Sequence, residues 1–303
     1  MDLEKKKLRL GIIGVSDGNG HPYSWSSIFN GYDKTLMKSC PYPGIPKYLE
    51  KYTFPDVTIN NASVSHIWTQ NKKDSTKIAN TTFIKNIVDY PNEMIGHVDG
   101  ILLARDDYKN HYELARNFIE AGLPIYIDKP LGINVDMAKK ILDMQKYEGQ
   151  VFTGSALAYD PLLEKLKEDL KSCGKLKFIF GTAPGSWDKY SVHLIDPILK
   201  VLDKKFKIKE STKLIEGKYS NFRGVINDNC YFSLQCLGGI KSPMRITFIA
   251  DKGFKEIEFH EDPFLAFKSA LVKFTNNITK KNIIRSKKDI IQSIKLISLG
   301  INI

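Results

Sequence analysis

The chain has 303 residues, 42% of them hydrophobic, which is enough for two domains with cores of ordinary size. It carries 45 Lys and Arg against 34 Asp and Glu, a formal net charge of +11, but the basic residues are scattered, which argues against nucleic-acid binding. No stretch approaches the roughly 20 apolar residues of a membrane helix. Neither a signal peptide nor a C-x-x-C pair occurs, so we expect a cytoplasmic protein with reduced cysteines, no metal site and no membrane partner.

The first predicted strand, residues 8–15, is apolar and leads into a turn that contains glycine. In a dinucleotide-binding fold the pyrophosphate binds at such a turn, against backbone amides and a helix N-terminus. The match to G-x-G-x-x-G is imperfect because Ser16 occupies the second glycine position, and a plain strand-to-loop turn is nearly as good an interpretation. The candidate cofactor contacts here are Gly14, Ser16, Gly18, Asn19 and Gly20.

A long excursion, residues 21–62, separates this turn from the second predicted strand, residues 63–70. It is rich in aromatic residues and proline, with one short helix capped by Ser24 or Ser26 and another at residues 45–51. Two interpretations stay open: a surface insertion with its own small core, or a wall over a cofactor or substrate.

The tip of the second strand has no carboxylate of the kind that binds an adenosine ribose. Gln70 and Lys72 are the candidate contacts there. Lys72 and Lys73 suit a 2′-phosphate and favour NADP weakly, whereas Asp74 could serve a ribose, so the choice between NAD and NADP stays open.

The stretch from 98 to 130 predicts a strand, a helix and a second strand at residues 98–104, 111–121 and 124–127. Such a unit is a right-handed crossover in a parallel sheet, whose ligands bind beyond the carboxyl ends of the strands. Two polar clusters fall at that edge, one from Arg105 to His111 and one formed by Asp128, Lys129 and Pro130. A solvated loop and an ordinary Lys-Pro turn are the alternative interpretation.

A helix at 135–147 and a strand at 151–156 complete a Rossmann domain of residues 1–156 that contains the 21–62 insertion. The remainder, 157–303, begins with an amphipathic helix at 161–173 and ends with helices between 263 and 302. Between them lie six predicted strands joined by short turns, at 175–181, 206–212, 224–227, 231–237, 244–250 and 255–260. The fold class is therefore α/β: a Rossmann domain followed by an α+β domain with a mostly antiparallel open sheet.

The segment 187–196 places Tyr190, His193 and Asp196 three residues apart, on one face if the segment is helical. A histidine beside a carboxylate and a tyrosine suits proton transfer near neutral pH. The alternative is a structural histidine, buried and hydrogen-bonded, near a helix end capped by Asp188.

Three motifs together resemble the Gfo/Idh/MocA family of glucose-fructose oxidoreductase and inositol dehydrogenase. They are LGIIGV near the start, VDGILLAR to IDKP in the middle, and WDKYSVHLID later. The resemblance implies NAD or NADP in a Rossmann domain, and a second domain whose open sheet packs against a partner subunit in a dimer or tetramer.

By the same resemblance, Lys129 contacts the substrate hydroxyl and the nicotinamide, and His193 exchanges the hydroxyl proton. Asp196 matches the family's acidic residue three positions further on, and His111 matches the histidine of the cofactor-side loop. The candidate catalytic set is thus Lys129, His193, Asp196 and Tyr190, and the loop candidates for the cofactor are Arg105, His111, Asp128 and Lys129.

The sequence departs from the family pattern at the glycine turn, at the tip of the second strand, and at Lys189, where the family often has Asp. The leading hypothesis is an NAD(P)-dependent oxidoreductase for a secondary alcohol or ketone of a sugar or sugar derivative, including sugar nucleotides. We expect Lys129 and His193 to serve one reaction. The alternative is a non-catalytic relative that binds a metabolite or regulates a partner; nucleic-acid binding rests on the charge alone.

Overall fold

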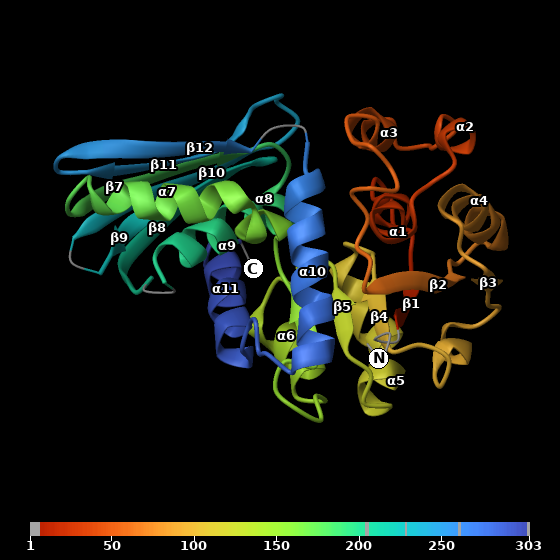
Figure 1. Cartoon of the computed structure of the whole chain (residues 1–303). Helices are drawn as coiled ribbons and strands as arrows, with labels where there is room; N and C mark the ends of the chain where they lie inside the picture. The colour runs from red at the N-terminus through yellow and green to blue at the C-terminus, as the bar shows by residue number, and fades with distance from the viewer. Residues whose placement is uncertain (1–6, 204–205, 228, 260–261, 302–303) are drawn as a thin grey trace, which may run out of the picture. The chain divides into compact units, whose positions relative to one another are not determined.

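The computed structural model describes residues 7–203, 206–227, 229–259 and 262–301. The chain forms two compact units: unit 1 is Met1–Leu131, Asp136–Thr153 and Ala270–Lys287, and unit 2 is Gly132–Val135, Gly154–Ser269 and Lys288–Ile303 (Figure 1). Unit 2 thus contains most of the second half of the chain, while a stretch near the C-terminus belongs to unit 1.

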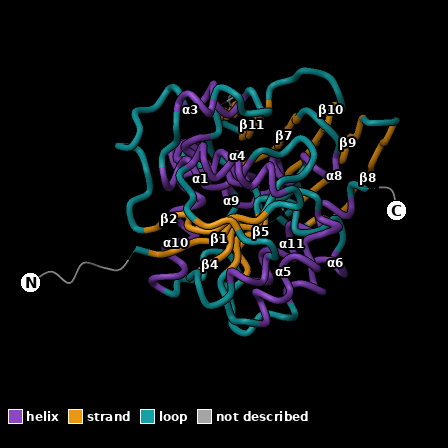
Figure 2. The backbone as a smooth tube through the Cα atoms, turned by 90° about the vertical axis from the view of Figure 1, so that its right-hand side faces the viewer, coloured by secondary structure: helices purple, strands orange, loops and turns teal. Residues whose placement is uncertain are grey.

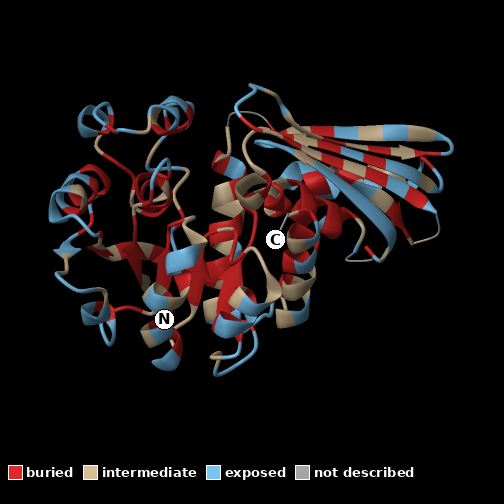
Figure 3. Cartoon of the chain, turned by 180° about the vertical axis from the view of Figure 1, so that it is seen from behind, coloured by how far each residue is buried: buried red, intermediate tan, exposed pale blue. Residues whose placement is uncertain are grey.

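Unit 1 has a six-stranded parallel sheet of order β3-β2-β1-β4-β5-β6. Its strands are β1 (Leu8–Ile13), β2 (Ala62–Trp68), β3 (Asn86–Ile87), β4 (Gly100–Leu103), β5 (Ile125–Ile127) and β6 (Val151–Thr153). This is the strand order of a Rossmann fold, so that prediction is confirmed. The central strands are buried because helices cover both faces, which explains their continuous apolar runs (Figure 3).

The helices of unit 1 connect consecutive strands, and Figure 2 shows α1 and α5 on opposite sides of the sheet. They are α1 (His21–Asn30), α2 (Lys34–Met37), α3 (Gly44–Leu49), α4 (Lys72–Thr82), α5 (His111–Glu120) and α6 (Val135–Leu142), with short 3-10 turns η1 (Pro91–Met94) and η2 (Tyr108–Asn110). Phe274, from α10 (Phe264–Lys280), packs against Tyr126 and Phe152 of β5 and β6.

The start of α1 was predicted wrongly. The helix begins at His21, directly after the turn, and is not capped by Ser24 or Ser26, which are buried inside it. Two of its serine hydroxyls have partners in that core: Ser24 contacts the Tyr48 hydroxyl at 2.5 Å, and Ser27 donates to the Tyr23 carbonyl at 2.8 Å. The polar appearance of the segment therefore hid a buried helix, and the inserted part of the chain begins only after it, at Gly31.

Unit 2 has a mixed sheet of order β12-β11-β7-β10-β9-β8. All its pairings are antiparallel except that of β10 with β7, which confirms the mostly antiparallel prediction. The strands are β7 (Leu176–Ala183), β8 (Ile208–Glu216), β9 (Tyr219–Ile226), β10 (Cys230–Leu237), β11 (Met244–Ala250) and β12 (Gly253–Phe259). Residue 260 of the predicted last strand and residue 302 of the predicted last helix lie outside the described residues.

One face of this sheet is covered by α7 (Pro161–Lys171) and α9 (Val192–Val201), which contact β12, β7 and β11. α8 (Trp187–Tyr190) precedes α9, α11 (Lys287–Leu299) ends the chain, and η3 (Ala156–Tyr159) precedes α7. The Trp187 indole donates to the Ile297 carbonyl at 2.8 Å, which fixes α8 on α11. The alternation of buried and exposed residues along β10 reflects a sheet with only one covered face (Figure 3).

Candidate functional site

The predicted cofactor residues of unit 1 gather at the carboxyl ends of β1, β2, β4 and β5, the edge where parallel sheets bind ligands. Beyond β1 the chain makes a four-residue turn, in which the amide of Asn19 donates to the Ser16 carbonyl at 3.0 Å. Gly18 has φ +73°, as the third position of a type II turn requires, and open space surrounds it. α1 then begins at once.

Gly14 allows β1, α1 and the end of β4 to approach one another closely. A Cβ atom there would lie 2.5 Å from Cγ of Pro22 and 3.0 Å from the Ala104 carbonyl oxygen. This is a role expected of the first glycine of a dinucleotide fingerprint, although the later glycines are displaced.

Lys129 is held at the same edge by Asp106, a residue that the sequence analysis did not single out. The Lys129 ammonium lies 3.7 Å from Oδ2 of Asp106, and both side chains are 13% exposed. The other oxygen of Asp106 accepts from the Ser16 hydroxyl at 2.7 Å. Asp106 therefore links the turn after β1 to Lys129; its position directly after a buried strand was the signal that could have identified it.

Asp128 is buried to 2% exposure, and three donors surround its carboxylate. Oδ2 accepts from the side-chain amide of Asn19 at 2.8 Å and lies 2.7 Å from Nδ1 of His21, while Oδ1 accepts from the Lys129 backbone amide at 2.8 Å. Burial acts to raise the pKa of Asp128, but the positive charges of His21 and Lys129 and the hydrogen bonds outweigh it and hold that pKa far below its usual value. His21 was also missed by the sequence analysis.

The tip of β2 is connected to the neighbouring strand ends by Gln70. Its amide donates to the Val15 carbonyl at 2.8 Å, and its Oε1 accepts from Arg105 at 2.9 Å. Arg105 is itself paired with Asp107. Burial acts to raise the pKa of Asp107, but the hydrogen bonds from Arg105 and Asn110 and the charge of Arg105 outweigh burial and lower that pKa. Lys72 pairs with Asp89 at 2.6 Å, so its contact with a 2′-phosphate stays a prediction.

His111 is fully buried, with Nε2 at 2.8 Å from the Arg105 carbonyl and Nδ1 at 3.4 Å from the Leu131 carbonyl. Burial lowers the pKa of His111, and the ring contacts the loop after β4 through the Arg105 carbonyl and the loop after β5 through the Leu131 carbonyl. This is a structural task; a direct contact with a cofactor stays a prediction.

The inserted segment reaches the turn through Tyr42. A Cβ atom at Gly20 would lie 2.3 Å from the Tyr42 ring, so the two are in contact. Burial, followed by the charges of Asp74, Cys40, Asp17 and Asp106, raises the pKa of Tyr42. The segment thus lies against the turn, as the wall interpretation expects, and also has a core of its own that includes Ile45 and Leu49.

In unit 2, His193 lies on α9 with Nδ1 at 2.8 Å from the Ser155 hydroxyl, and the Tyr190 ring packs edge-on at 5.9 Å. Asp196 is buried and accepts from the Ser155 amide at 2.8 Å and from the Ser293 hydroxyl at 2.6 Å. Asp196 therefore anchors the segment that carries Ser155, and Ser155 in turn contacts His193. Ser155 lies 38 positions before His193, so no local pattern linked the two residues.

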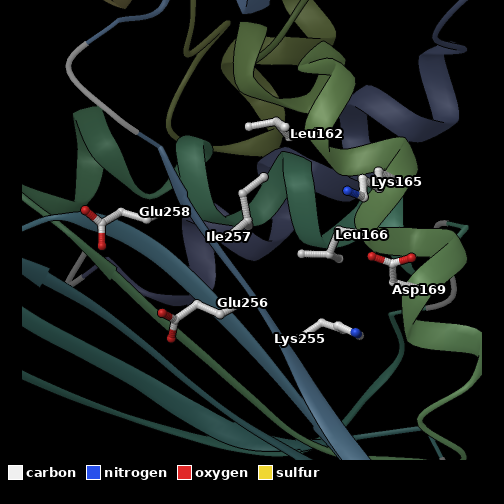
Figure 4. A pocket seen from close by; sticks show the side chains of 8 residues that line it. All are labelled: Leu162, Lys165, Leu166, Asp169, Lys255, Glu256, Ile257 and Glu258. Atoms are coloured by element: carbon white, nitrogen blue, oxygen red, sulfur yellow. The ribbon is translucent and has the colours of Figure 1, made fainter.

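A separate hollow of about 280 Å³ lies between α7 and β12 of unit 2 (Figure 4). Mixed charges and three aliphatic side chains line it, and none of the predicted site residues is among them. Among the residues that the structure describes, no cluster of His, Cys, Asp and Glu could hold a metal ion. Within those same residues, no helix is long and apolar enough to span a membrane.

The residues of unit 1 fit a dinucleotide at this edge. The open space around Gly18 leaves room beside the turn, Gly14 brings α1 close to β1, and Ser16, Gln70 and Arg105 supply polar groups at three strand ends. The fold and this edge define a protein of the Rossmann dinucleotide-binding class.

Comparison with known proteins specifies the class. Residues 44–155 match the family described as "Oxidoreductase family, NAD-binding Rossmann fold". The rhizopine catabolism protein MocA of Rhizobium meliloti is 28% identical over 95 residues, which are 31% of this chain and 29% of that protein.

Two structures of scyllo-inositol dehydrogenase from Lactobacillus casei share the fold over nearly the whole chain. The apo form has a TM-score of 0.75 at 13% identity, covering 98% of this chain and 96% of that one. The form with bound NAD(H) and scyllo-inositol has a TM-score of 0.71 at 14% identity, covering 97% and 96%. The matches over residues 44–155 and to MocA confirm the predicted resemblance to the Gfo/Idh/MocA oxidoreductases, and the matched family is described as NAD-binding.

Proposed function

We propose that the protein is an NAD(P)-dependent oxidoreductase that interconverts a secondary alcohol and a ketone of a sugar or sugar derivative. The observation that carries the proposal is Lys129, held by Asp106 at the carboxyl end of β5 and joined through Asp106 to the dinucleotide turn. An inositol dehydrogenase and a rhizopine catabolism protein among the similar proteins support a polyhydroxylated substrate. The basic net charge suits an anionic one, such as a sugar nucleotide.

A bound nicotinamide would accept or supply the hydride. Gly14, Ser16, Gly18, Asn19 and Gly20, with Gln70 and Arg105, are the residues that we expect to hold the dinucleotide. The Lys129 ammonium would donate a hydrogen bond to the substrate oxygen and stabilise negative charge there. Asp106 keeps this ammonium in place, because the two side chains form an ion pair that is only slightly exposed.

His193 would exchange the hydroxyl proton. To accept a proton at Nε2, the ring must carry its hydrogen on Nδ1 and donate it to the Ser155 hydroxyl, which the 2.8 Å distance permits. Asp196 supports this arrangement by binding the Ser155 amide, and Tyr190 packs against the ring.

The test is turnover with each of NAD and NADP against a panel of polyols, sugars and sugar nucleotides. Lys129→Ala and His193→Asn should each reduce kcat by about 100-fold or more. In the double variant, kcat should fall by far less than the product of the two single reductions if both residues serve one step. Full turnover in both variants would rule the assignment out.

We also propose a homo-oligomer formed through the open face of the unit 2 sheet. Phe178, Phe180 and Tyr231 are 40 to 50% exposed there, and their rings stack on one another. Contiguous exposed aromatic side chains indicate an interface. Light scattering should give a dimer or tetramer, and Phe180→Glu should yield a smaller species.

A non-catalytic role in metabolite binding is the second candidate. The observation that favours it is the first turn of α1. The His21 backbone N–H donates to the Asn19 side chain, and Pro22 has no backbone N–H to donate to a phosphate. Calorimetry with NAD, NADH, NADP and NADPH decides: binding of none of them would favour this role.

A further inference from the structure

A closed ring of polar contacts joins the turn after β1 to the strand end that carries Lys129. Ser16 binds Asp106, and Asp106 pairs with Lys129. Asp128, the neighbour of Lys129, in turn binds Asn19 and His21 at the start of α1. Because β4 lies between β1 and β5 in the sheet, these contacts reach across a whole strand.

His21 is the only aromatic member of this ring, and it has a second connection to β5. Its imidazole stacks on Trp25 at 5.1 Å and 15°, and Trp25 stacks on Tyr126 at 4.8 Å. Tyr126 lies in β5, two residues before Asp128, which directly follows that strand. The start of α1 is therefore attached to the end of β5 both by a hydrogen bond at Asp128 and by a stack of three rings.

The hydrogen bond at Asp128 matters because the carboxylate is charged and buried. A buried carboxylate without hydrogen-bond partners destabilises the fold. The loop that carries Asp128 is therefore stable in the position where the carboxylate accepts hydrogen bonds from its donors. His21 Nδ1, at 2.7 Å, is the shortest of the three contacts to Asp128. Lys129 follows directly and donates its backbone amide to the same carboxylate.

We propose that His21 is a positioning residue: through Asp128 it couples the turn 16–20 to Lys129, so that a dinucleotide bound at the turn orders the lysine. The inference rests on the proposed function for the role of Lys129, whereas the coupling itself is a property of unit 1. It assigns a positioning task to a histidine outside the proposed catalytic set.

Hydrogen exchange followed by mass spectrometry tests the coupling in the full chain. Peptides covering 14–21 and 125–131 are followed without ligand and with NAD, NADH, NADP or NADPH. In the wild type, the dinucleotide that binds should slow exchange in both peptides. His21→Phe keeps a ring for Trp25 but has no donor, and His21→Asn keeps an amide donor close to the place of Nδ1.

In His21→Phe the 125–131 peptide should exchange about 10- to 100-fold faster, the loss expected for one hydrogen bond to a charged group, and the dinucleotide should protect 14–21 alone. His21→Asn should retain protection in both peptides. His97→Phe and His97→Asn, at an exposed histidine before the amino end of β4, are the matched controls and should behave as the wild type. His21→Leu replaces the Phe variant if that variant does not fold.

Unchanged exchange at 125–131 in the donorless variant, or equal behaviour of His21→Phe and His21→Asn, would overturn the inference. If no dinucleotide binds, the proposed function fails, but the ligand-free comparison still decides whether His21 holds the Lys129 loop. Where turnover is found, His21→Phe should lower kcat by about 10- to 100-fold while KM for the sugar substrate changes little, and His21→Asn should restore kcat.

Discussion

The buried His111 should make unit 1 less stable as the pH falls from 7 to 5. Its ring is fully buried between two backbone carbonyls, and burial lowers its pKa below the unfolded value of about 6.5. Between the folded pKa and about 6.5, the unfolded chain therefore binds a proton that the native state does not. Stability rises with pH across this window and is lost as pH falls.

The slope can reach about 1.4 kcal/mol per pH unit, the limit for a difference of one proton. His111→Gln keeps an amide donor for the Arg105 carbonyl, the nearer partner, but cannot titrate. The variant should be less stable at pH 7 and should show a shallower loss of stability on acidification.

Urea unfolding at half-unit steps from pH 7 to 5 measures this, with Trp25 and Trp68 as fluorescent reporters in unit 1. Trp187, in unit 2, is replaced by Phe in both proteins to remove its signal. The pKa of His66 is also lowered, by partial burial and by its neighbours His97 and Arg9, and the slope that it contributes is common to both proteins. Identical slopes with and without His111 would refute the reasoning.

Three further outcomes are expected. Asp128→Asn should destabilise the protein by about 1–3 kcal/mol at pH 7. Because the folded pKa of Asp128 is depressed, the stability that this carboxylate contributes is present above about pH 4 and is lost below it. The melting temperatures of variant and wild type should therefore converge in acid, and a constant difference would contradict this. Gly14→Ala should cost about 1–3 kcal/mol and weaken dinucleotide binding, since its Cβ would meet Pro22 and the Ala104 carbonyl; calorimetry and thermal unfolding check it, and wild-type affinity would contradict it. Ser155→Ala, which removes the hydroxyl at His193, should lower kcat by about 10-fold or more with little change in the melting temperature, whereas unchanged kcat would remove Ser155 from the site.

The sequence alone determined the elements whose pattern is local. The apolar runs of β1, β4 and β5 and the helical spacing of α5 identified a parallel crossover unit, and its strand ends identified Lys129 and Asp128. Periodicity and turn residues act over a few neighbours, so such features need no tertiary information.

Only the tertiary structure revealed the residues that support the candidate site. Asp106 and His21 act on Lys129 and Asp128 across 23 and 107 positions of sequence, and Ser155 meets His193 across 38. The same holds for α1, whose serines look solvent-facing but are buried in the folded core, where Ser24 contacts the hydroxyl of Tyr48, 24 positions away. Hydrogen bonds between distant residues leave no periodic trace in a sequence, since they depend on which strand ends the sheet brings together.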